Sequence, residues 1–169
     1  MVTNAHVVAG TQTVRLDTKL GLKDASVVYY NPEVDIAVLH APDLGIQPLP
    51  WAQQPAQTGD DAMVMGFPHS GPFNAEMARV RDRITIAGPD IYSQGRVERD
   101  SYTVRGNIQQ GNSGGPLVNT AGEVLGVIFG ASVDDSETGY ALTADEVIGN
   151  IGDVTQLQRP VETGECVAH

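Results

Sequence analysis

Short segments of β-branched and apolar residues recur along most of the chain, and turn-forming residues separate them. The segments whose pattern is typical of strands are residues 11–18, 26–30, 35–41, 62–67, 76–86, 97–105 and 124–129. Gly, Pro, Asn and Asp lie between these segments, as in Asn31-Pro32 and Gly71-Pro72. Many short strands joined by tight turns predict an all-β fold, built as a sandwich or a barrel.

Two stretches interrupt the strand pattern and divide the chain. Residues 51–61 are polar, contain Pro and Gly and lack periodicity, so we interpret them as a linker between two β units. Thr143 and Glu146 have the spacing of a capping box, which predicts one short helix that ends near Gly152. The predicted organisation is a first β unit, a linker, a second β unit, and a helix with a C-terminal tail, over residues 1–50, 51–61, 62–142 and 143–169.

The composition excludes several classes of protein. A net charge of −11 repels a phosphate backbone, which argues against nucleic-acid binding. No apolar run reaches the roughly 18 residues that a membrane helix needs, and no signal peptide is visible. No group of His, Cys or Asp residues has the spacing of a metal site, so we expect neither a metal nor a cofactor. His40 and His69 are interpreted as structural or exposed residues.

The strongest chemical signal is the segment Gly111-Asn112-Ser113-Gly114-Gly115. Glycines around a serine permit tight backbone conformations and leave the hydroxyl open to a substrate. The N–H groups of Gly111 and Ser113 could then converge on one point and stabilise an oxyanion. The simpler interpretation is a glycine-rich turn that contains a serine with no chemical role.

Two weaker signals precede this segment. His6 lies among small residues with apolar residues behind it, and Asp35 comes directly before an apolar strand. Taken alone, His6 could be an ordinary surface or core histidine and Asp35 could be a turn residue. A serine nucleophile needs a base, and the base needs a carboxylate that fixes its tautomer. The order His, Asp, Ser is that of chymotrypsin-type enzymes.

The sequences TNAHVV, DIAVL and GNSGGPLV resemble the catalytic motifs of the trypsin-like superfamily in their bacterial HtrA-like form. The C-terminal half is also similar to the actinobacterial acid-resistance periplasmic serine proteases, the MarP family. The resemblance implies two six-stranded antiparallel β-barrels and a serine endopeptidase that acts on proteins or peptides without a cofactor. It implies that His6 is the general base, Asp35 its orienting carboxylate and Ser113 the nucleophile, with Gly111 and Ser113 forming the oxyanion hole.

The resemblance also assigns the substrate-binding residues. Asn107 falls at the floor of the pocket for the P1 side chain, where trypsin has an acid, so we expect an uncharged P1 residue. Ile128, Phe129 and Gly130 are expected to pair with the substrate backbone as an added strand. Gly139 and Tyr140 are expected to line the far wall of the pocket.

Family members have strands before the histidine motif, whereas this chain starts at Met1, so we expect an N-terminally truncated first barrel. The resemblance implies a parent protein anchored in the membrane through a missing N-terminal region, with the protease on the periplasmic side. Cys166 is the single cysteine, and it is either a free thiol or half of a disulfide with an upstream cysteine. The alternatives to an active protease are a non-catalytic peptide-binding module and an incomplete, inactive fragment.

Overall fold

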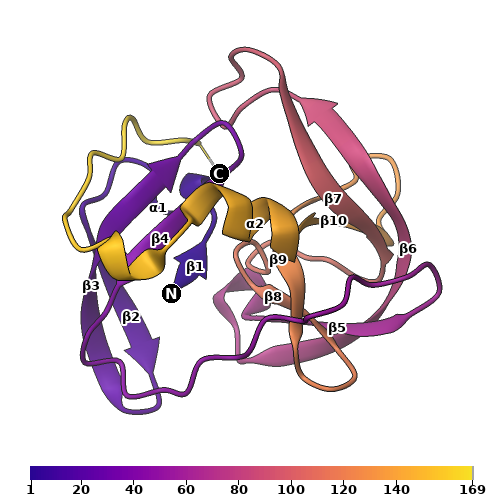
Figure 1. Cartoon of the computed structure of the whole chain (residues 1–169), viewed down its shortest axis with the longest axis horizontal. Coiled ribbons are helices and arrows are strands. Elements are labelled where there is room, and N and C mark those ends of the chain that lie inside the picture. Colours follow the sequence, from indigo (N-terminus) through magenta and orange to yellow (C-terminus); the bar gives the residue numbers. More distant parts are fainter. Residues whose placement is uncertain (169) are drawn as a thin grey trace. The chain divides into compact units, whose positions relative to one another are not determined.

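The computed structural model describes residues 1–168 and divides into two compact units. The first unit contains residues 1–48, 88–97 and 151–168, and the second contains residues 49–87 and 98–150. Both units are built mainly from antiparallel strands, as the sequence predicts (Figure 1).

The first unit is an open four-stranded antiparallel sheet with the strand order β1-β4-β3-β2. Its strands are β1 (Val2–Thr3), β2 (Thr13–Thr18), β3 (Gly21–Asn31) and β4 (Ile36–His40). A one-turn helix, α1 (Ala5–Val8), follows β1, and buried apolar residues of α1, β3 and β4 form the core. The expectation of an incomplete first barrel is confirmed, because this sheet does not close on itself.

The C-terminal tail completes the core of the first unit. After the short 3-10 turn η2 (Val154–Gln156), Val161 packs against the core and its N–H donates to the carbonyl of Val27 at 2.9 Å. The N–H of Gly10 donates to the carbonyl of Thr163 at 3.0 Å. The tail therefore holds the segment that follows α1.

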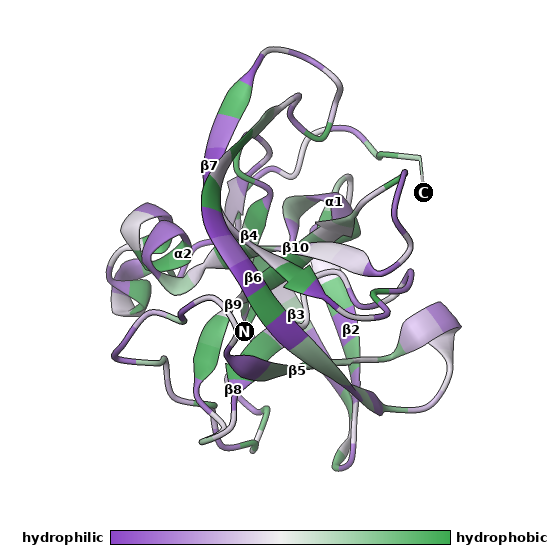
Figure 2. Cartoon of the chain, turned by 90° about the vertical axis from the view of Figure 1, so that its right-hand side faces the viewer, coloured by the Kyte–Doolittle hydropathy of each residue, from purple (hydrophilic) through white to green (hydrophobic). Residues whose placement is uncertain are grey.

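The second unit is a closed six-stranded barrel with the strand order β10-β7-β6-β5-β8-β9. Its strands are β5 (Asp61–Gly66), β6 (Asn74–Gly88), β7 (Val97–Arg105), β8 (Pro116–Asn119), β9 (Val124–Ala131) and β10 (Thr138–Thr143). Hydrophobic and hydrophilic residues alternate along β6 (Figure 2), where Ala78 and Val80 are buried and Arg79 and Arg81 are exposed. β5 alternates in the same way, whereas β9 is buried over five consecutive residues, Val124–Ile128, and together these strands enclose one apolar interior.

Helix α2 (Ala144–Ile151) follows β10 and begins at the predicted capping box. The hydroxyl of Thr143 accepts the N–H of Glu146 at 3.1 Å, as expected. In a complete capping box the Glu146 carboxylate would in turn accept the N–H of Thr143, but Thr143 is here the last residue of β10, where it is paired with Gly126. The carboxylate of Glu146 accepts the N–H of Asp100 instead. Burial, followed by the charge of Asp100, raises the pKa of Glu146.

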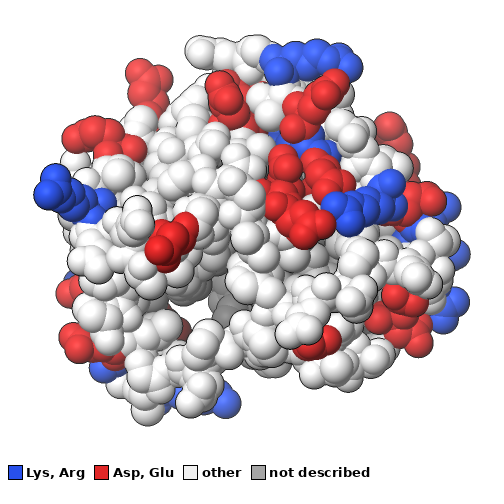
Figure 3. Space-filling view, in the orientation of Figure 1, with Lys and Arg blue, Asp and Glu red and all other residues white. Residues whose placement is uncertain are grey.

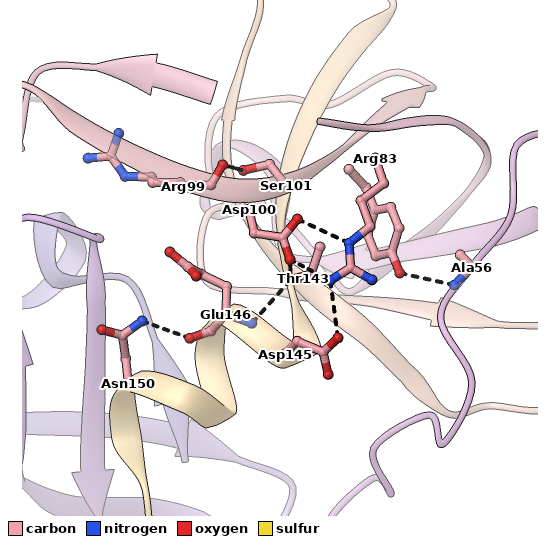
Figure 4. A network of polar contacts seen from close by, with 10 residues as sticks. Ala56, Arg83, Arg99, Asp100, Ser101, Thr143, Asp145, Glu146 and Asn150 are labelled. Carbon is pink, nitrogen blue, oxygen red and sulfur yellow. Dashed lines mark hydrogen bonds and ion pairs between the residues drawn. The ribbon is translucent and has the colours of Figure 1, made fainter. Parts of the chain in front are cut away.

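An ion-pair network connects the barrel strands to α2 (Figure 4). The guanidinium of Arg83 on β6 donates through two nitrogens to Asp100 on β7, and it reaches Asp145 on α2 at 3.1 Å. Asp100 also accepts the hydroxyl proton of Thr143 at 2.9 Å. The hydrogen bond from Arg83 is the main cause that lowers the pKa of Asp100, and the bond from Thr143 acts in the same direction.

Replacing Asp100 with Asn is expected to lower the Tm by about 2–4 °C near neutral pH, which corresponds to roughly 1 kcal/mol. A carboxyl whose folded-state pKa is depressed stabilises the fold above its unfolded value of 3.8 and loses this contribution as the pH falls further. The Tm difference between wild type and Asp100→Asn should therefore shrink in thermal melts below about pH 4. The control is Asp61→Asn in the exposed pair with Arg79, which should leave the Tm nearly unchanged. A pH-independent difference would contradict the account.

The acidic composition is visible on the surface. Carboxylate side chains are spread over the face seen in Figure 3, as expected from a net charge of −11. Among residues 1–168, no helix has both the length and the apolar composition needed to cross a bilayer.

Candidate active site

His6 is held on α1 in the first unit. The buried residues Ala5 and Val8 anchor this single helical turn in the core, and the His6 side chain remains 22% exposed. Its Nδ1 lies 2.6 Å from Oδ2 of Asp35. The main-chain N–H of His6 donates to the other carboxylate oxygen of Asp35 at 2.9 Å. Asp35 therefore contacts His6 through both oxygens, and its own side chain is only 7% exposed.

This contact fixes the tautomer of the imidazole. An ionised carboxylate can only accept hydrogen bonds, so the proton between the two side chains lies on Nδ1 of His6. In the neutral ring, Nε2 is then the acceptor, which is the state that a general base requires. The pairing of His6 with Asp35, which the sequence suggested only through its motifs, is present in the structure.

Asp35 has a left-handed backbone conformation, with φ of 68°. Asp and Asn adopt this conformation more readily than other residues with a side chain, but it is still uncommon and is stabilised by neighbouring contacts. The N–H of Asp35 donates to the carbonyl of Asn31 at 3.0 Å. The side chain of Asn31 accepts the N–H groups of Glu33 and Val34 inside the same turn. A loop closed at several points therefore presents the carboxylate to His6.

Ser113 lies in the second unit, in a turn between β7 and β8. The N–H of Asn112 donates to the carbonyl of Gln109 at 3.1 Å, and Gly111 has φ of 100°, a combination typical of a type II turn. The N–H of His69 donates to the carbonyl of Gln110 at 2.8 Å. Because the two polar groups of a peptide point in opposite directions, the N–H of Gly111 points away from His69.

The segment after Ser113 is fixed by β9. Gly114 donates its N–H to the carbonyl of Ile128 at 2.8 Å, and the N–H of Ile128 donates to the carbonyl of Gly115 at 2.9 Å. In contrast, the N–H groups of Gly111 and Ser113 donate to no group within residues 1–168. These two donors are therefore available to a ligand, and their role as an oxyanion hole stays a prediction.

Position 111 requires glycine both for its backbone conformation and because a larger residue would not fit. A Cβ placed there would lie 2.6 Å from the carbonyl oxygen of Phe67 and 3.0 Å from the nitrogen of His69. The serine turn therefore packs directly on the 3-10 turn η1 (Pro68–Ser70). His40 and His69 are both exposed, as predicted, but the main chain of His69 has a role that its residue type did not indicate.

The predicted substrate-binding residues all belong to the second unit. Asn107 is exposed and follows β7, while Ile128, Phe129 and Gly130 lie on β9. Gly139 lies on β10, where a Cβ would overlap the side chain of Ile108. Their binding roles stay predictions.

Two side chains lie near the ring of Phe129, and the sequence pointed to only one of them, Tyr140. The ring of Tyr140 lies 6.2 Å from the Phe129 ring, and the guanidinium of Arg99 lies 5.7 Å from it. Arg99 is only 6% exposed. An arginine is usually exposed, so neither its residue type nor its position in a strand indicated that it would be buried beside an aromatic ring.

Cys166 is a free, exposed cysteine in the tail. It lies against Gly10, where a side chain would collide with its sulfur. The predicted disulfide with a cysteine outside this sequence therefore stays a prediction.

Residues 1–127 match the family of the trypsin-like peptidase domain, and the chain belongs to this family. Serine protease Rv3671c of Mycobacterium tuberculosis strain H37Rv is 48% identical over 169 residues, which are 99% of this chain and 42% of that protein. Protease Do-like 1 of Arabidopsis thaliana, which is chloroplastic, is 28% identical over 173 residues, 95% of this chain and 38% of that protein. The chain thus spans less than half the length of these relatives.

Solved structures agree with this classification. The crystal structure of the Rv3671c protease in its active form matches with a TM-score of 0.94 at 48% identity, covering 99% of this chain and 74% of that chain. An inactive form of the same protease matches with a TM-score of 0.81 at 47% identity, covering 94% and 79%. The predicted chymotrypsin-like fold and the resemblance to HtrA-like proteases are confirmed.

Proposed function

We propose that this chain is the protease domain, or most of it, of a serine endopeptidase that uses His6, Asp35 and Ser113. The observation that carries the proposal is the 2.6 Å contact between Nδ1 of His6 and Oδ2 of Asp35 in a chain of the trypsin-like peptidase family. This contact leaves Nε2 of the imidazole as the base. The available N–H groups of Gly111 and Ser113 support the placement of the oxyanion hole.

The reaction proceeds through an acyl-enzyme. Nε2 of His6 accepts the proton of the Ser113 hydroxyl while Oγ attacks the peptide carbonyl, and the N–H groups of Gly111 and Ser113 stabilise the oxyanion. His6 then gives the proton to the departing amine, and the C–N bond breaks. Water, deprotonated by His6, then attacks the acyl carbonyl, and His6 passes this proton to Oγ of Ser113 as the ester C–O bond breaks. Asp35 stays ionised throughout and stabilises the imidazolium.

The family relationship does not favour the alternative of a non-catalytic peptide-binding module. The test is labelling with a fluorophosphonate probe, followed by identification of the modified residue by mass spectrometry. We expect labelling of Ser113, and we expect no labelling of the Ser113→Ala variant. Peptide binding by a wild-type chain that the probe does not label would instead support the binding module.

For cleavage specificity, we expect an uncharged residue at P1. Asn107 offers no negative charge at the position assigned to the pocket floor, and an uncompensated Lys or Arg would lose its hydration without gaining an ion pair. Profiling with a peptide library should therefore yield apolar or small polar P1 residues, with the substrate backbone paired along Ile128–Gly130. A profile dominated by Lys or Arg would show that the assignment of Asn107 is wrong.

The cellular context follows from the resemblance alone. We propose that the parent protein is anchored in the membrane and presents this domain on the periplasmic side, and that Cys166 forms a disulfide with an upstream cysteine. Fractionation of cells that express the parent protein, and mass mapping of Cys166 without reduction, test the two parts separately. Recovery of the parent in the soluble cytoplasmic fraction would contradict the location.

A further inference from the structure

Asn4 is completely buried, although asparagine is mostly exposed in folded proteins. It lies between β1 and α1, at the N-cap position of the helix. An asparagine at this position usually accepts a helix N–H with its side-chain oxygen, but Asn4 makes no such bond. Its Nδ2 instead donates to the main-chain carbonyl of Asp35 at 3.0 Å.

The side chain of Asp35, and not that of Asn4, caps the N-terminus of α1. Oδ1 of Asp35 accepts the main-chain N–H of His6, the second residue of α1, at 2.9 Å. The two residues have thus exchanged partners: the carboxylate of Asp35 caps the helix, and the amide of Asn4 binds the carbonyl of Asp35. As a result, Oδ1 of Asn4 is buried without a hydrogen-bond partner within residues 1–168.

This arrangement does not maximise stability. A buried acceptor without a donor is destabilising, and few native side chains are left in this state. What the hydrogen bond from Asn4 does stabilise is the backbone of Asp35, whose left-handed φ of 68° is held by contacts with its surroundings. The carbonyl of Asn31 holds the N–H of Asp35, and Asn4 holds its carbonyl.

We propose that Asn4 is a positioning residue for the catalytic base. By holding the carbonyl of Asp35, it fixes the backbone rotation that directs one carboxylate oxygen to the N–H of His6 and the other to Nδ1. The inference rests on the proposed function, because it assigns Asn4 to the same His6–Asp35 pair. A loss of alignment of about 1 Å at such a site lowers turnover by as much as 100-fold.

The deciding variant in the intact chain is Asn4→Leu, which is close to asparagine in shape. It removes the unpaired Oδ1 but also leaves the carbonyl of Asp35 without its donor, so the two effects offset each other and the Tm should stay close to that of wild type. At the same time kcat should fall by roughly 10- to 100-fold, while KM stays within about twofold. A merely structural role predicts the opposite, a lower Tm with normal turnover of the folded enzyme.

Proton NMR reports on the hydrogen bond between His6 and Asp35 independently of catalytic activity. The far-downfield resonance of the Nδ1 proton of His6 should be present in wild type and should shift upfield or broaden in Asn4→Leu. Asn119→Ala is the matched control, because this asparagine holds the turn between β8 and β9 through its own Oδ1. It should lower the Tm and leave both the resonance and kcat unchanged.

The outcomes separate the two proposals. A wild-type chain that shows the resonance but never turns over substrate would remove the proposed function and leave the role of Asn4 at His6–Asp35 in place. Wild-type kcat and an unchanged resonance in Asn4→Leu would overturn the role of Asn4. Failure of both Asn4→Leu and Asn4→Ala to fold would also overturn it, because Asn4 would then serve stability.

Discussion

Replacing Asp35 with Asn is expected to lower kcat by about 10⁴-fold, as in the same change in other Ser-His-Asp enzymes, while the fold is retained. The fold should survive because Asn tolerates the left-handed conformation that Asp35 adopts. The amide nitrogen facing the ring would be a donor, so Nδ1 of His6 would have to become the acceptor. Nε2 would then carry the proton and could no longer accept one from Ser113.

Steady-state kinetics on a peptide substrate, with the Tm as a check on folding, measures this effect. Asp90→Asn is the matched control in the same unit, because Asp90 uses Oδ1 to accept the N–H groups of Tyr92 and Gln94, and Asn can do the same. This control should retain full activity. An Asp35→Asn variant that keeps a tenth or more of wild-type kcat would show that the carboxylate does not orient the base.

The second large effect is expected from Gly111→Ala, which should lower kcat by about 10²- to 10³-fold. The new Cβ would lie 2.6 Å from the carbonyl oxygen of Phe67, and alanine disfavours the φ of 100° at this position. The Gln110–Gly111 peptide must then rotate, which breaks its bond to the N–H of His69 and turns the N–H of Gly111 away from the oxyanion.

Gly122→Ala separates this effect from ordinary strain. Gly122 has φ of 80° in the turn between β8 and β9, and a Cβ there would meet no atom within 4 Å. Both variants should therefore lose some stability, but only Gly111→Ala should lose turnover per folded molecule. Equal activity of the two variants, measured by active-site titration and kinetics, would contradict the role of the Gly111 N–H.

The sequence predicted those parts of the fold and site that depend on side-chain pattern. The alternation of apolar residues located most strands, and the motifs around His6 and Asp35 anticipated their contact. Strand β10 (Thr138–Thr143) was not predicted, because Gly139 interrupts the pattern and polar residues precede it. Helix α1 was also missed, since a single turn gives no periodicity.

Contacts that involve the main chain were beyond prediction for a different reason. His69 acts on Gln110 through its backbone N–H, and any residue except proline supplies that group. Asn4 binds a main-chain carbonyl 31 residues away, so no local pattern encodes the bond. The sequence indicated the residues that we propose carry the chemistry, but it did not indicate those that hold them in place.

The proposed mechanism requires His6 of the first unit and Ser113 of the second to act together on one substrate. A peptidyl chloromethyl ketone with an uncharged P1 residue tests this directly, because the reagent alkylates the imidazole and bonds to the serine hydroxyl of one active site. We expect inactivation in which a single inhibitor joins residues 6 and 113, shown by mass spectrometry of the digested adduct. An unmodified chain, or an inhibitor attached to His6 in a chain whose Ser113 never reacts, would contradict the proposed mechanism.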